Sequence, residues 1–461
     1  MAMSDSILTV LNPATGQPVA DVEVQGTDEA DAIVRRAGAA FPAWRQVAPP
    51  DRARLLRRFA GLVEANAEEL ALLETRNVGK PITDSRGEVA MVADVLYFYA
   101  GAVDKHRGAT IPVSGGVDLT LHEPLGVVVA IVPWNFPLAI TSWKVGPALA
   151  CGNTVVVKPA QLTPLTALRF AELALEAGIP EGVLQVVVGP GSTVGSFLVE
   201  HPDVAKVAFT GSTDAGRDVM ARAAGTIKRV TLELGGKSAN VVFADADLER
   251  AASSAPSAVF GNAGQDCCAR SRILVERSAF DRFVDLFIAA TDAVVIGDPE
   301  DPATQMGPLV SEGHRADVSS FLEPSTEAPP VVYRGVERGG PGWWFAPAVV
   351  APAAPGSRLW RDEVFGPVVA VTPFDDEEHA ISLANDTPYG LSGSVWTRDG
   401  ARALRMARAV DAGVLSVNSN TSVRVNAPFG GMKQSGFGRE LGLEALDAYS
   451  DVKNIFLSTE S

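Results

Sequence analysis

The chain has 461 residues, of which 47% are hydrophobic and 20% charged. These fractions are typical of globular proteins and exclude disordered, collagen-like and coiled-coil architectures, and the length predicts about three domains. The chain has 39 Lys and Arg against 55 Asp and Glu, a net charge of −16. We therefore expect no nucleic-acid or anionic-membrane partner, because both need a basic surface.

The chain has three cysteines, Cys151, Cys267 and Cys268. An odd, sparse count predicts no disulfide framework, and neighbouring cysteines rarely form a structural bridge. The N-terminal residues show no basic segment followed by an apolar one, so no signal peptide is expected. The longest apolar stretch, 125–140, is interrupted by prolines and is shorter than the roughly 20 residues of a membrane helix. We expect a soluble cytoplasmic protein.

Residues 27–100 are rich in Ala, Leu and Glu with helical periodicity, so we expect helices there. Beyond them, short β-branched runs alternate with stretches of helical period such as 164–177 and 215–223. The runs are 126–132, 154–158, 184–188, 206–209 and 229–234. Strands separated by helices of this length predict βαβ units and a parallel sheet, hence a doubly wound α/β domain.

A second α/β region is expected from residue 240 onward. Helix-like stretches occur at 279–293 and 399–410, among strand-like runs at 272–276, 367–374, 392–397 and 413–418. The Pro- and Gly-rich segment 324–342 predicts a surface loop.

The cysteine pair lies in a polar segment, FGNAGQDCCARSR (260–272). A free Cys is most often a small buried hydrophobe, but a thiol at a polar turn can be ionised by nearby amide dipoles and become reactive. A nucleophilic thiol usually needs a base. No histidine lies among other functional residue types, so Glu233, on an otherwise apolar strand, is the better candidate. A carboxylate entering a core is costly unless it is used or paired, and an ion-paired structural Glu is the alternative.

Two glycine-rich segments follow predicted strands and are candidates for a dinucleotide site. The segment 186–195, VVVGPGSTVG, resembles GxGxxG but is one residue too long. The segment 209–216, FTGSTDAG, would place the backbone N–H groups of Gly211, Ser212 and Thr213 at a helix N-terminus, where anions bind. Either segment could instead be an ordinary turn between a strand and a helix.

Polar side chains follow two further predicted strands. After 126–132, two prolines fix the backbone around Trp134, Asn135 and Phe136, and the Asn135 amide could donate to a developing oxyanion. Lys158 ends its strand at the edge where α/β folds bind ligands. A plain turn and a lysine that reaches solvent are the alternatives. The sequence has no CxxC pair, HExxH motif or EF-hand loop, so no metal site is expected.

Eight motifs, in order, resemble the aldehyde dehydrogenase superfamily over nearly the whole chain: PWNFP, VVVKPAQLTPL, FTGSTDAG, LELGGKSAN, NAGQDCCA, DEVFGPV, ANDTPYGLS and PFGGMKQSGFGRE. The resemblance implies an α/β fold in three parts, and a homodimer or homotetramer. A Rossmann-type cofactor domain would comprise residues 1–105 and 125–235, an α/β catalytic domain residues 236–432, and a small oligomerisation arm residues 106–124 and 433–461.

The resemblance also implies roles in NAD(P)-dependent oxidation of an aldehyde to a carboxylic acid. Cys267 would form a thiohemiacetal and then a thioester, Asn135 would hold the oxyanion with the backbone N–H of Cys267, and Glu233 would activate the hydrolytic water. Lys144 would help hold the nicotinamide or tune the thiolate. Cofactor contacts would come from Trp134, Lys158, Gln161, Gly211, Ser212, Gly216, Leu234, Glu363 and Phe365.

Gln161 departs from the family pattern, because many NAD-dependent members have a carboxylate there. NAD is expected as the cofactor, and NADP is the alternative, since an amide does not repel a 2′-phosphate. Asp362, beside Glu363, replaces a usual Glu.

The substrate pocket is expected to include Phe136, Ile140, Trp143, Asp266, Cys268 and Phe429. Asp266 resembles the aminoaldehyde dehydrogenases and could pair with an ammonium group, which favours 4-aminobutyraldehyde or a related aldehyde. Asp266 could also simply cap its turn. Arg270 and Arg424 could instead attract a carboxylated semialdehyde, and a general aliphatic or aromatic aldehyde is a further alternative.

Three other functions compete with this interpretation. A CoA-acylating dehydrogenase would form the same thioester but needs no hydrolytic base, so Glu233 argues against it. A non-catalytic binding protein could share the fold, but the intact set of Cys267, Glu233 and Asn135 argues against that. A thiol esterase would cleave esters without a cofactor.

Overall fold

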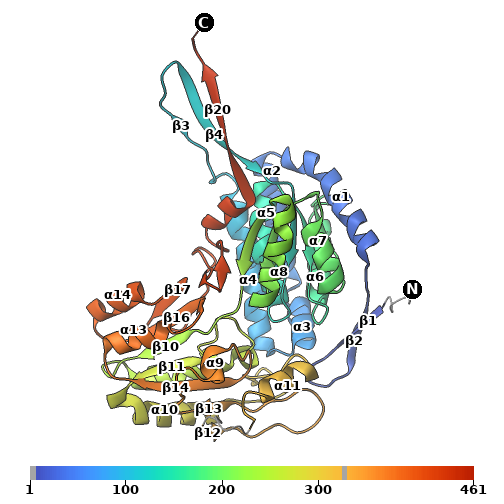
Figure 1. Cartoon of the computed structure of the whole chain (residues 1–461). Coiled ribbons are helices and arrows are strands. Elements are labelled where there is room, and N and C mark those ends of the chain that lie inside the picture. Colours follow the sequence, from blue (N-terminus) through green and yellow to red (C-terminus); the bar gives the residue numbers. More distant parts are fainter. Residues whose placement is uncertain (1–6, 324–329, 461) are drawn as a thin grey trace.

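The computed structural model describes residues 7–323 and 330–460. It consists of two α/β lobes and an antiparallel arm that projects from one of them, with the C-terminus at its tip (Figure 1). Among the described residues, no helix is long and apolar enough to cross a membrane.

The sheet of the first lobe confirms the five strands predicted between residues 126 and 234. Its order is β19-β9-β8-β5-β6-β7, and all pairs are parallel except that of the edge strand β19. The order reverses beside β5, because β6 and β7 lie on one side of it and β8 and β9 on the other. Ligands of such sheets bind outside the carboxyl ends of the strands at this reversal. The strands are β5 (Val127–Ile131), β6 (Thr154–Lys158), β7 (Leu184–Val186), β8 (Val204–Thr210), β9 (Arg229–Glu233) and β19 (Gly436–Phe437).

Helices cover both faces of this sheet because its strands are apolar on both sides. In β5, Val127 and Val129 join a core with α1, α7 and α8, whereas Val128 and Ala130 join a core with α2 to α6. The helices are α1 (Thr27–Arg45), α2 (Pro49–Ala65), α3 (Ala67–Val78), α4 (Ile82–Ala102), α5 (Pro137–Cys151), α6 (Leu165–Glu176), α7 (Ser196–Glu200) and α8 (Thr213–Ala223).

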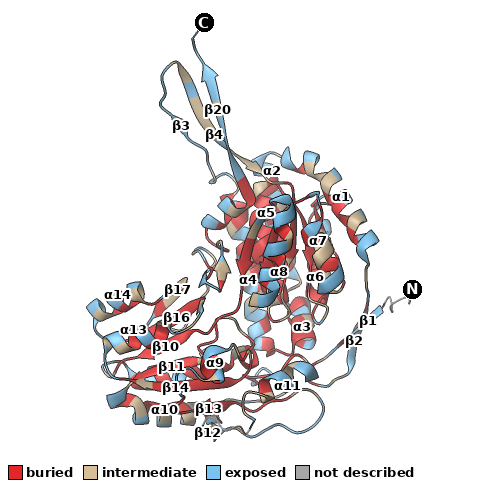
Figure 2. Cartoon of the chain, viewed as in Figure 1, coloured by how far each residue is buried: buried red, intermediate tan, exposed pale blue. Residues whose placement is uncertain are grey.

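The second lobe has a sheet of order β12-β13-β14-β11-β10-β16-β17, parallel except at its edge strand β12. Its core strands are buried (Figure 2), with α9 and α10 packed in one core and α13 and α14 in the other. The strands are β10 (Ala239–Val242), β11 (Arg272–Glu276), β12 (Val331–Arg334), β13 (Ala348–Val350), β14 (Val368–Phe374), β16 (Ser392–Trp396) and β17 (Val414–Val417). The helices are α9 (Leu248–Phe260), α10 (Phe280–Asp292), α11 (Glu312–Ser319), α12 (Arg358–Arg361), α13 (Glu377–Asn385) and α14 (Gly400–Ala409).

The surface loop expected over 324–342 is only partly correct. Residues 324–329 lie outside the described part of the chain, and β12 occupies Val331–Arg334. This strand pairs antiparallel with β13, with Val331 opposite Val350. Two valines and a tyrosine favour a strand, and the prolines and glycines on either side concealed this short edge strand.

The arm joins two segments that are more than 300 residues apart. Strand β20 (Ser450–Ser458) pairs antiparallel with β4 (Gly116–Pro124) along its whole length, from Ser450 opposite Pro124 to Ser458 opposite Gly116. The short strand β3 (Thr110–Ile111) pairs with the other edge of β4. The arm stands away from the body, and much of its surface is exposed (Figure 2). Two small pairs complete the fold: β1 (Ile7–Leu11) with β2 (Pro18–Glu23), and β15 (Tyr389–Gly390) with β18 (Met432–Lys433).

Candidate active site

A cavity of about 520 Å³ lies between the two lobes and is lined by residues from both. Glu233, the last residue of β9, lines it from the first lobe, and Cys267, in the turn between α9 and β11, lines it from the second. The structure therefore brings the two main predicted catalytic residues into one cavity.

The turn that carries Cys267 is tightly constrained. After α9 ends, Asn262 and Ala263 adopt positive φ angles of 49° and 55°, and Asp266 Oδ1 then accepts a 2.8 Å hydrogen bond from the Cys268 N–H. The segment between β9 and β10 runs directly against this turn, because a Cβ at Gly236 would lie 2.3 Å from the Cys267 carbonyl oxygen. Only glycine permits that approach.

Cys267 is half-buried, and its surroundings disfavour the thiolate. A hydrogen bond with the Cys268 side chain, followed by burial, raises the pKa of the Cys267 thiol well above its ordinary value. The sequence suggested a thiol ionised by amide dipoles. The neighbouring thiol and burial favour the protonated form instead, so a reaction at the Cys267 sulfur needs a proton acceptor.

Glu233 is a buried carboxylate that faces the cavity. Neither of its oxygens has a hydrogen-bond partner within residues 7–323 and 330–460, so the alternative of an ion-paired structural Glu is not met. Burial, followed by the charge of Glu440, raises the pKa of Glu233 well above its ordinary value, and the charge of Lys144 opposes the shift. A carboxylate with a raised pKa and a free lone pair suits a general base near neutral pH.

Asn135 holds the turn before the nucleophile. Its Nδ2 donates to the Gln265 carbonyl at 2.9 Å, and its own carbonyl accepts from Asn262 Nδ2 at 3.1 Å. These bonds connect the start of α5 in the first lobe to the cysteine turn in the second. The amide thus lies beside the nucleophile segment, with one of its donors already used.

Lys144 lies in α5 and is fully buried. Its Nζ donates to Thr210 Oγ1 at 2.7 Å and forms an ion pair with Glu440. Thr210 and Glu440 both line the cavity. The structure therefore places Lys144 behind the cavity wall, where its charge acts on Glu440 and Glu233.

The predicted cofactor residues gather at the carboxyl ends of the first sheet. Lys158 ends β6, lies beside Gly195, and forms no ion pair with a carboxylate in the described ranges. Burial lowers the pKa of Lys158 to about 8. Ser212 is the N-cap of α8, and its side chain accepts from the Ala215 N–H at 3.3 Å. A buried lysine at the end of one strand and a helix N-terminus after another suit the hydroxyl and phosphate groups of a dinucleotide.

A close contact fixes α8 against the end of β9. A Cβ at Gly216 would lie 2.5 Å from Leu234 Cδ2, and Leu234 lines the cavity. Gly211, one residue after β8, donates its N–H to the Glu233 carbonyl at 3.1 Å. Gln161 is half-buried in the turn after β6.

Three ring side chains, Trp134, His314 and Phe365, contact one another in the predicted cofactor region. The Trp134 ring lies 5.2 Å from the rings of both Phe365 and His314, in edge contacts. His314 Nε2 also bonds the Phe365 carbonyl at 2.8 Å. Glu363 Oε1 accepts from the Gly236 N–H at 2.8 Å, and burial raises the pKa of Glu363 to about 7. Sequence reasoning missed His314, because helix α11 carries no motif.

All six predicted pocket residues line the cavity: Phe136, Ile140, Trp143, Asp266, Cys268 and Phe429. Trp143 and Phe429 make an edge contact with their centroids 5.3 Å apart. Sequence reasoning missed several polar lining residues, among them Glu88, Arg250 and Asn420. They lie on ordinary helix surfaces or in a loop without a motif, so only their position in space marks them.

The two arginines considered for a carboxylated substrate do not serve that purpose. Arg270 is buried and donates to backbone carbonyls and to Ser392, Ser394 and Ser422. Arg424 is exposed and does not line the cavity. Arg250 is the arginine that does line it.

A doubly wound sheet whose carboxyl edge adjoins a cavity with a thiol and a carboxylate that has no hydrogen-bond partner among the described residues is typical of a cofactor-dependent oxidoreductase. Comparison with known proteins agrees. The model of the "Aldehyde dehydrogenase family" matches residues 1–455, so the chain belongs to the aldehyde dehydrogenase family. It is an NAD(P)-dependent enzyme that oxidises aldehydes.

The chain is 43% identical to phenylacetaldehyde dehydrogenase of Pseudomonas fluorescens, over 99% of this chain and 94% of that protein. It is 42% identical to the NADP/NAD-dependent aldehyde dehydrogenase PuuC of Escherichia coli (strain K12), over 100% of this chain and 94% of the relative. The crystal structure of PnpE in complex with nicotinamide adenine dinucleotide matches with a TM-score of 0.97 and 42% identity, over 99% of this chain and 95% of that one. PnpE comes from Pseudomonas sp. WBC-3.

Proposed function

We propose that this aldehyde dehydrogenase acts on aldehydes that carry a cationic group, with 4-aminobutyraldehyde as the favoured substrate, through Cys267 and Glu233. The observation that carries the catalytic assignment is the buried carboxylate of Glu233, unpaired within the described part of the chain, in the same cavity as the Cys267 thiol. Such a group is costly to bury unless it is used.

In the proposed reaction, the Cys267 thiol gives its proton to water, and its thiolate adds to the aldehyde carbon to form a thiohemiacetal. The oxyanion is held by the backbone N–H of Cys267 and by Asn135, whose side chain already orients this turn. A bound nicotinamide ring would accept the hydride that leaves the thiohemiacetal carbon, so that Cys267 is left as a thioester. Glu233 then takes a proton from water, the water oxygen attacks the thioester carbon, and the thiolate of Cys267 leaves as the carboxylic acid forms.

For the coenzyme we propose NAD with NADP as a second acceptor. The half-buried side chain at position 161 is an amide rather than a carboxylate, so it does not repel a 2′-phosphate, and Lys158 lies at the end of the same strand. A ratio of kcat/KM values for NAD and NADP within about a hundredfold would agree with this assignment. A Gln161→Glu variant should shift that ratio toward NAD by tenfold or more.

One acidic side chain supports a cationic substrate. Asp266 from the cysteine turn lines the cavity, and the aromatic rings of Trp143 and Phe429 provide walls that a cation can contact. Glu88 also lines the cavity, but it is already paired with Lys80 at 2.6 Å. Asp266 does cap its turn, through Oδ1 and the Cys268 N–H, but its other oxygen is not used in that bond. The turn hydrogen bond is therefore compatible with the proposed pairing of Asp266 with an ammonium group.

The test compares kcat/KM for 4-aminobutyraldehyde with that for butanal, a neutral aldehyde of equal chain length, at saturating NAD. We expect a preference of at least tenfold, equivalent to about 1.4 kcal/mol. The Asp266→Asn variant keeps the turn hydrogen bond and removes the charge, so it should lose that preference while its butanal rate changes little. Equal values for the two aldehydes in the wild-type protein would refute the cationic assignment.

A carboxylated semialdehyde is the second candidate, and one observation favours it. Arg250 is exposed at the cavity wall, and its guanidinium lies 6.0 Å from the ring centre of Trp396, another lining residue. Succinic semialdehyde is the matched probe. If it is oxidised tenfold better than butanal, and Arg250→Gln abolishes the difference, the carboxylated class replaces the cationic one.

A further inference from the structure

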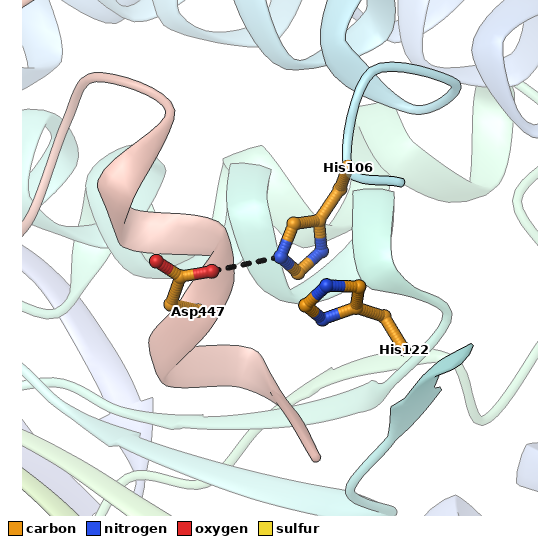
Figure 3. A group of neighbouring side chains, drawn as sticks. All are labelled: His106, His122 and Asp447. Carbon is orange, nitrogen blue, oxygen red and sulfur yellow. Dashed lines mark hydrogen bonds and ion pairs between the residues drawn. The ribbon is translucent and has the colours of Figure 1, made fainter. Parts of the chain in front are cut away.

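A cluster of three side chains with metal-binding chemistry lies at the base of the arm, outside the active-site cavity. His106 precedes β3, His122 lies in β4, and Asp447 lies in the helical turn before β20 (Figure 3). None of the three lines the cavity that contains Cys267. Each comes from a different segment, so only the folded chain brings them together.

The geometry of the cluster is compact. His106 Nε2 lies 2.9 Å from Asp447 Oδ1, and the two imidazole centroids are 3.6 Å apart. One ligand atom from each residue lies within 4.8 Å of the other two. Tetrahedral zinc with bonds of about 2.0–2.1 Å separates its ligand atoms by roughly 3.3 Å. Small side-chain rotations would therefore bring the three ligand atoms to the spacing that zinc requires.

We propose that His106, His122 and Asp447 bind a divalent transition-metal ion of the Zn²⁺ type. Two imidazoles and one carboxylate suit zinc and its neighbours, whereas magnesium and calcium prefer oxygen ligands alone. Three protein ligands leave a fourth position for water. A separate small cavity adjoins the two histidines and provides space for it.

The surroundings support the ligand set. The Ser450 Oγ lies 3.2 Å from His122 Nδ1 and can fix the orientation of that ring, which leaves Nε2 for the metal. Arg52 also lines the small cavity, but its guanidinium lies at the C-terminal end of α5, where a Cβ on Gly152 would be 2.7 Å from its Nη1. The negative end of the helix dipole offsets this charge.

The ion would cross-link three segments at the base of the arm. It would join the loop before β3, strand β4 and the turn before β20, and so would hold the arm against the body. An entry path exists, because the Asp447 side chain is 72% exposed and His106 is 16% exposed.

The test measures Zn²⁺ binding to the full-length protein by titration calorimetry. A second group of side chains, Asp266, Cys267 and Cys268, could also bind zinc, so the titration uses a Cys267→Ser, Cys268→Ser background. We expect one site per chain, with at least tenfold weaker affinity in His122→Ala. Asp447→Asn should weaken it similarly, and this exposed, nearly isosteric change leaves the fold intact.

The matched control is His379→Ala. His379 is a partly exposed histidine that contacts Asp375 at 3.1 Å but belongs to no group of three ligands in the described ranges. Its removal should leave Zn²⁺ affinity unchanged. Hydrogen exchange of the amides in β4 and β20 should slow when Zn²⁺ is added to the background protein, and should not slow in Asp447→Asn. Unaltered affinity in both His122→Ala and Asp447→Asn would overturn the proposal, as would an absence of binding in the cysteine-free background.

Discussion

The carboxylate of Glu233 is buried without a hydrogen bond to any residue in the described ranges, yet it lines a cavity large enough for substrate. In a static protein this arrangement is unfavourable, since a buried acceptor loses its bonds to water. In the proposed reaction the missing partner is the attacking water. The same feature therefore makes two predictions, one kinetic and one thermodynamic.

The kinetic prediction concerns Glu233→Gln. The amide keeps the shape of the side chain but cannot take a proton, and general-base catalysis contributes about 10²–10⁴-fold. We expect kcat to fall by that range, with a single-turnover burst of NADH before hydrolysis stalls. Rapid-mixing absorbance at the NADH band measures both phases. Normal steady-state turnover would exclude Glu233 as the base.

The thermodynamic prediction concerns pH. The ordinary pKa of a Glu is 4.5, and burial raises the pKa of Glu233 in the folded protein well above it. Between those two values the folded state binds more protons than the unfolded state, so the contribution of Glu233 to stability falls as pH rises. Glu233→Gln removes this loss. Its Tm should exceed that of the wild type at pH 8, and the difference should shrink as the pH falls toward 4.5; thermal unfolding at both pH values measures it.

At the scale of single elements, the packing of helix α8 against the end of β9 depends on one glycine, Gly216. The Cβ that any other residue would add at Gly216 meets Leu234 at 2.5 Å, and Leu234 follows Glu233 in the chain and lines the same cavity. Overpacking of this kind costs typically about 1–3 kcal/mol. Gly216→Val should lower the unfolding free energy by that amount and raise KM for NAD severalfold. Gly225→Val, at an open position after the same helix, is the control and should change neither KM nor the fold.

Most helices and strands could be predicted from local sequence. The pairing of strands that lie far apart in the chain could not. The apolar runs 154–158 and 272–276 coincide with β6 and β11, because buried parallel strands leave a continuous signal. The short strand β10 was missed, since the polar Asn240 interrupts its apolar residues. The pairing of β4 with β20 depends on segments far apart in the chain, which no local pattern specifies.

The candidate active site likewise contains some residues that the sequence indicates and others that only the packing of the lobes places there. Cys267 and Glu233 stand out because each is chemically unusual for its segment. Glu88 and Arg250 lie on α4 and near the start of α9, where charged residues usually face solvent, so their place in the cavity follows only from the packing of the two lobes. Lys144, which the resemblance assigns to the nicotinamide or the thiolate, forms an ion pair with Glu440 that no local pattern indicates.

At the scale of the whole molecule, the arm exposes apolar surface that a single chain does not cover. Val452, Phe456 and Leu457 of β20 are 64%, 52% and 54% exposed. A strand at a sheet edge with apolar side chains favours association with another chain. We expect a homodimer or homotetramer, with a light-scattering mass of two or four times 48.3 kDa. A monomer at micromolar concentration would contradict this, and Phe456→Asp should shift the distribution toward smaller species.

The candidate active site lies at the boundary between the two lobes. Its thiol belongs to one lobe and its carboxylate to the other, and the contact between them depends on the Gly236 backbone lying against the carbonyl of Cys267 and on the amide of Asn135. Each lobe has a core of its own, and a further core of the first lobe continues into the second through Cys268, Leu391 and Phe429. Because catalysis in the proposed reaction needs both lobes in register, we expect a mild denaturant to abolish activity while the circular dichroism is still that of the native protein.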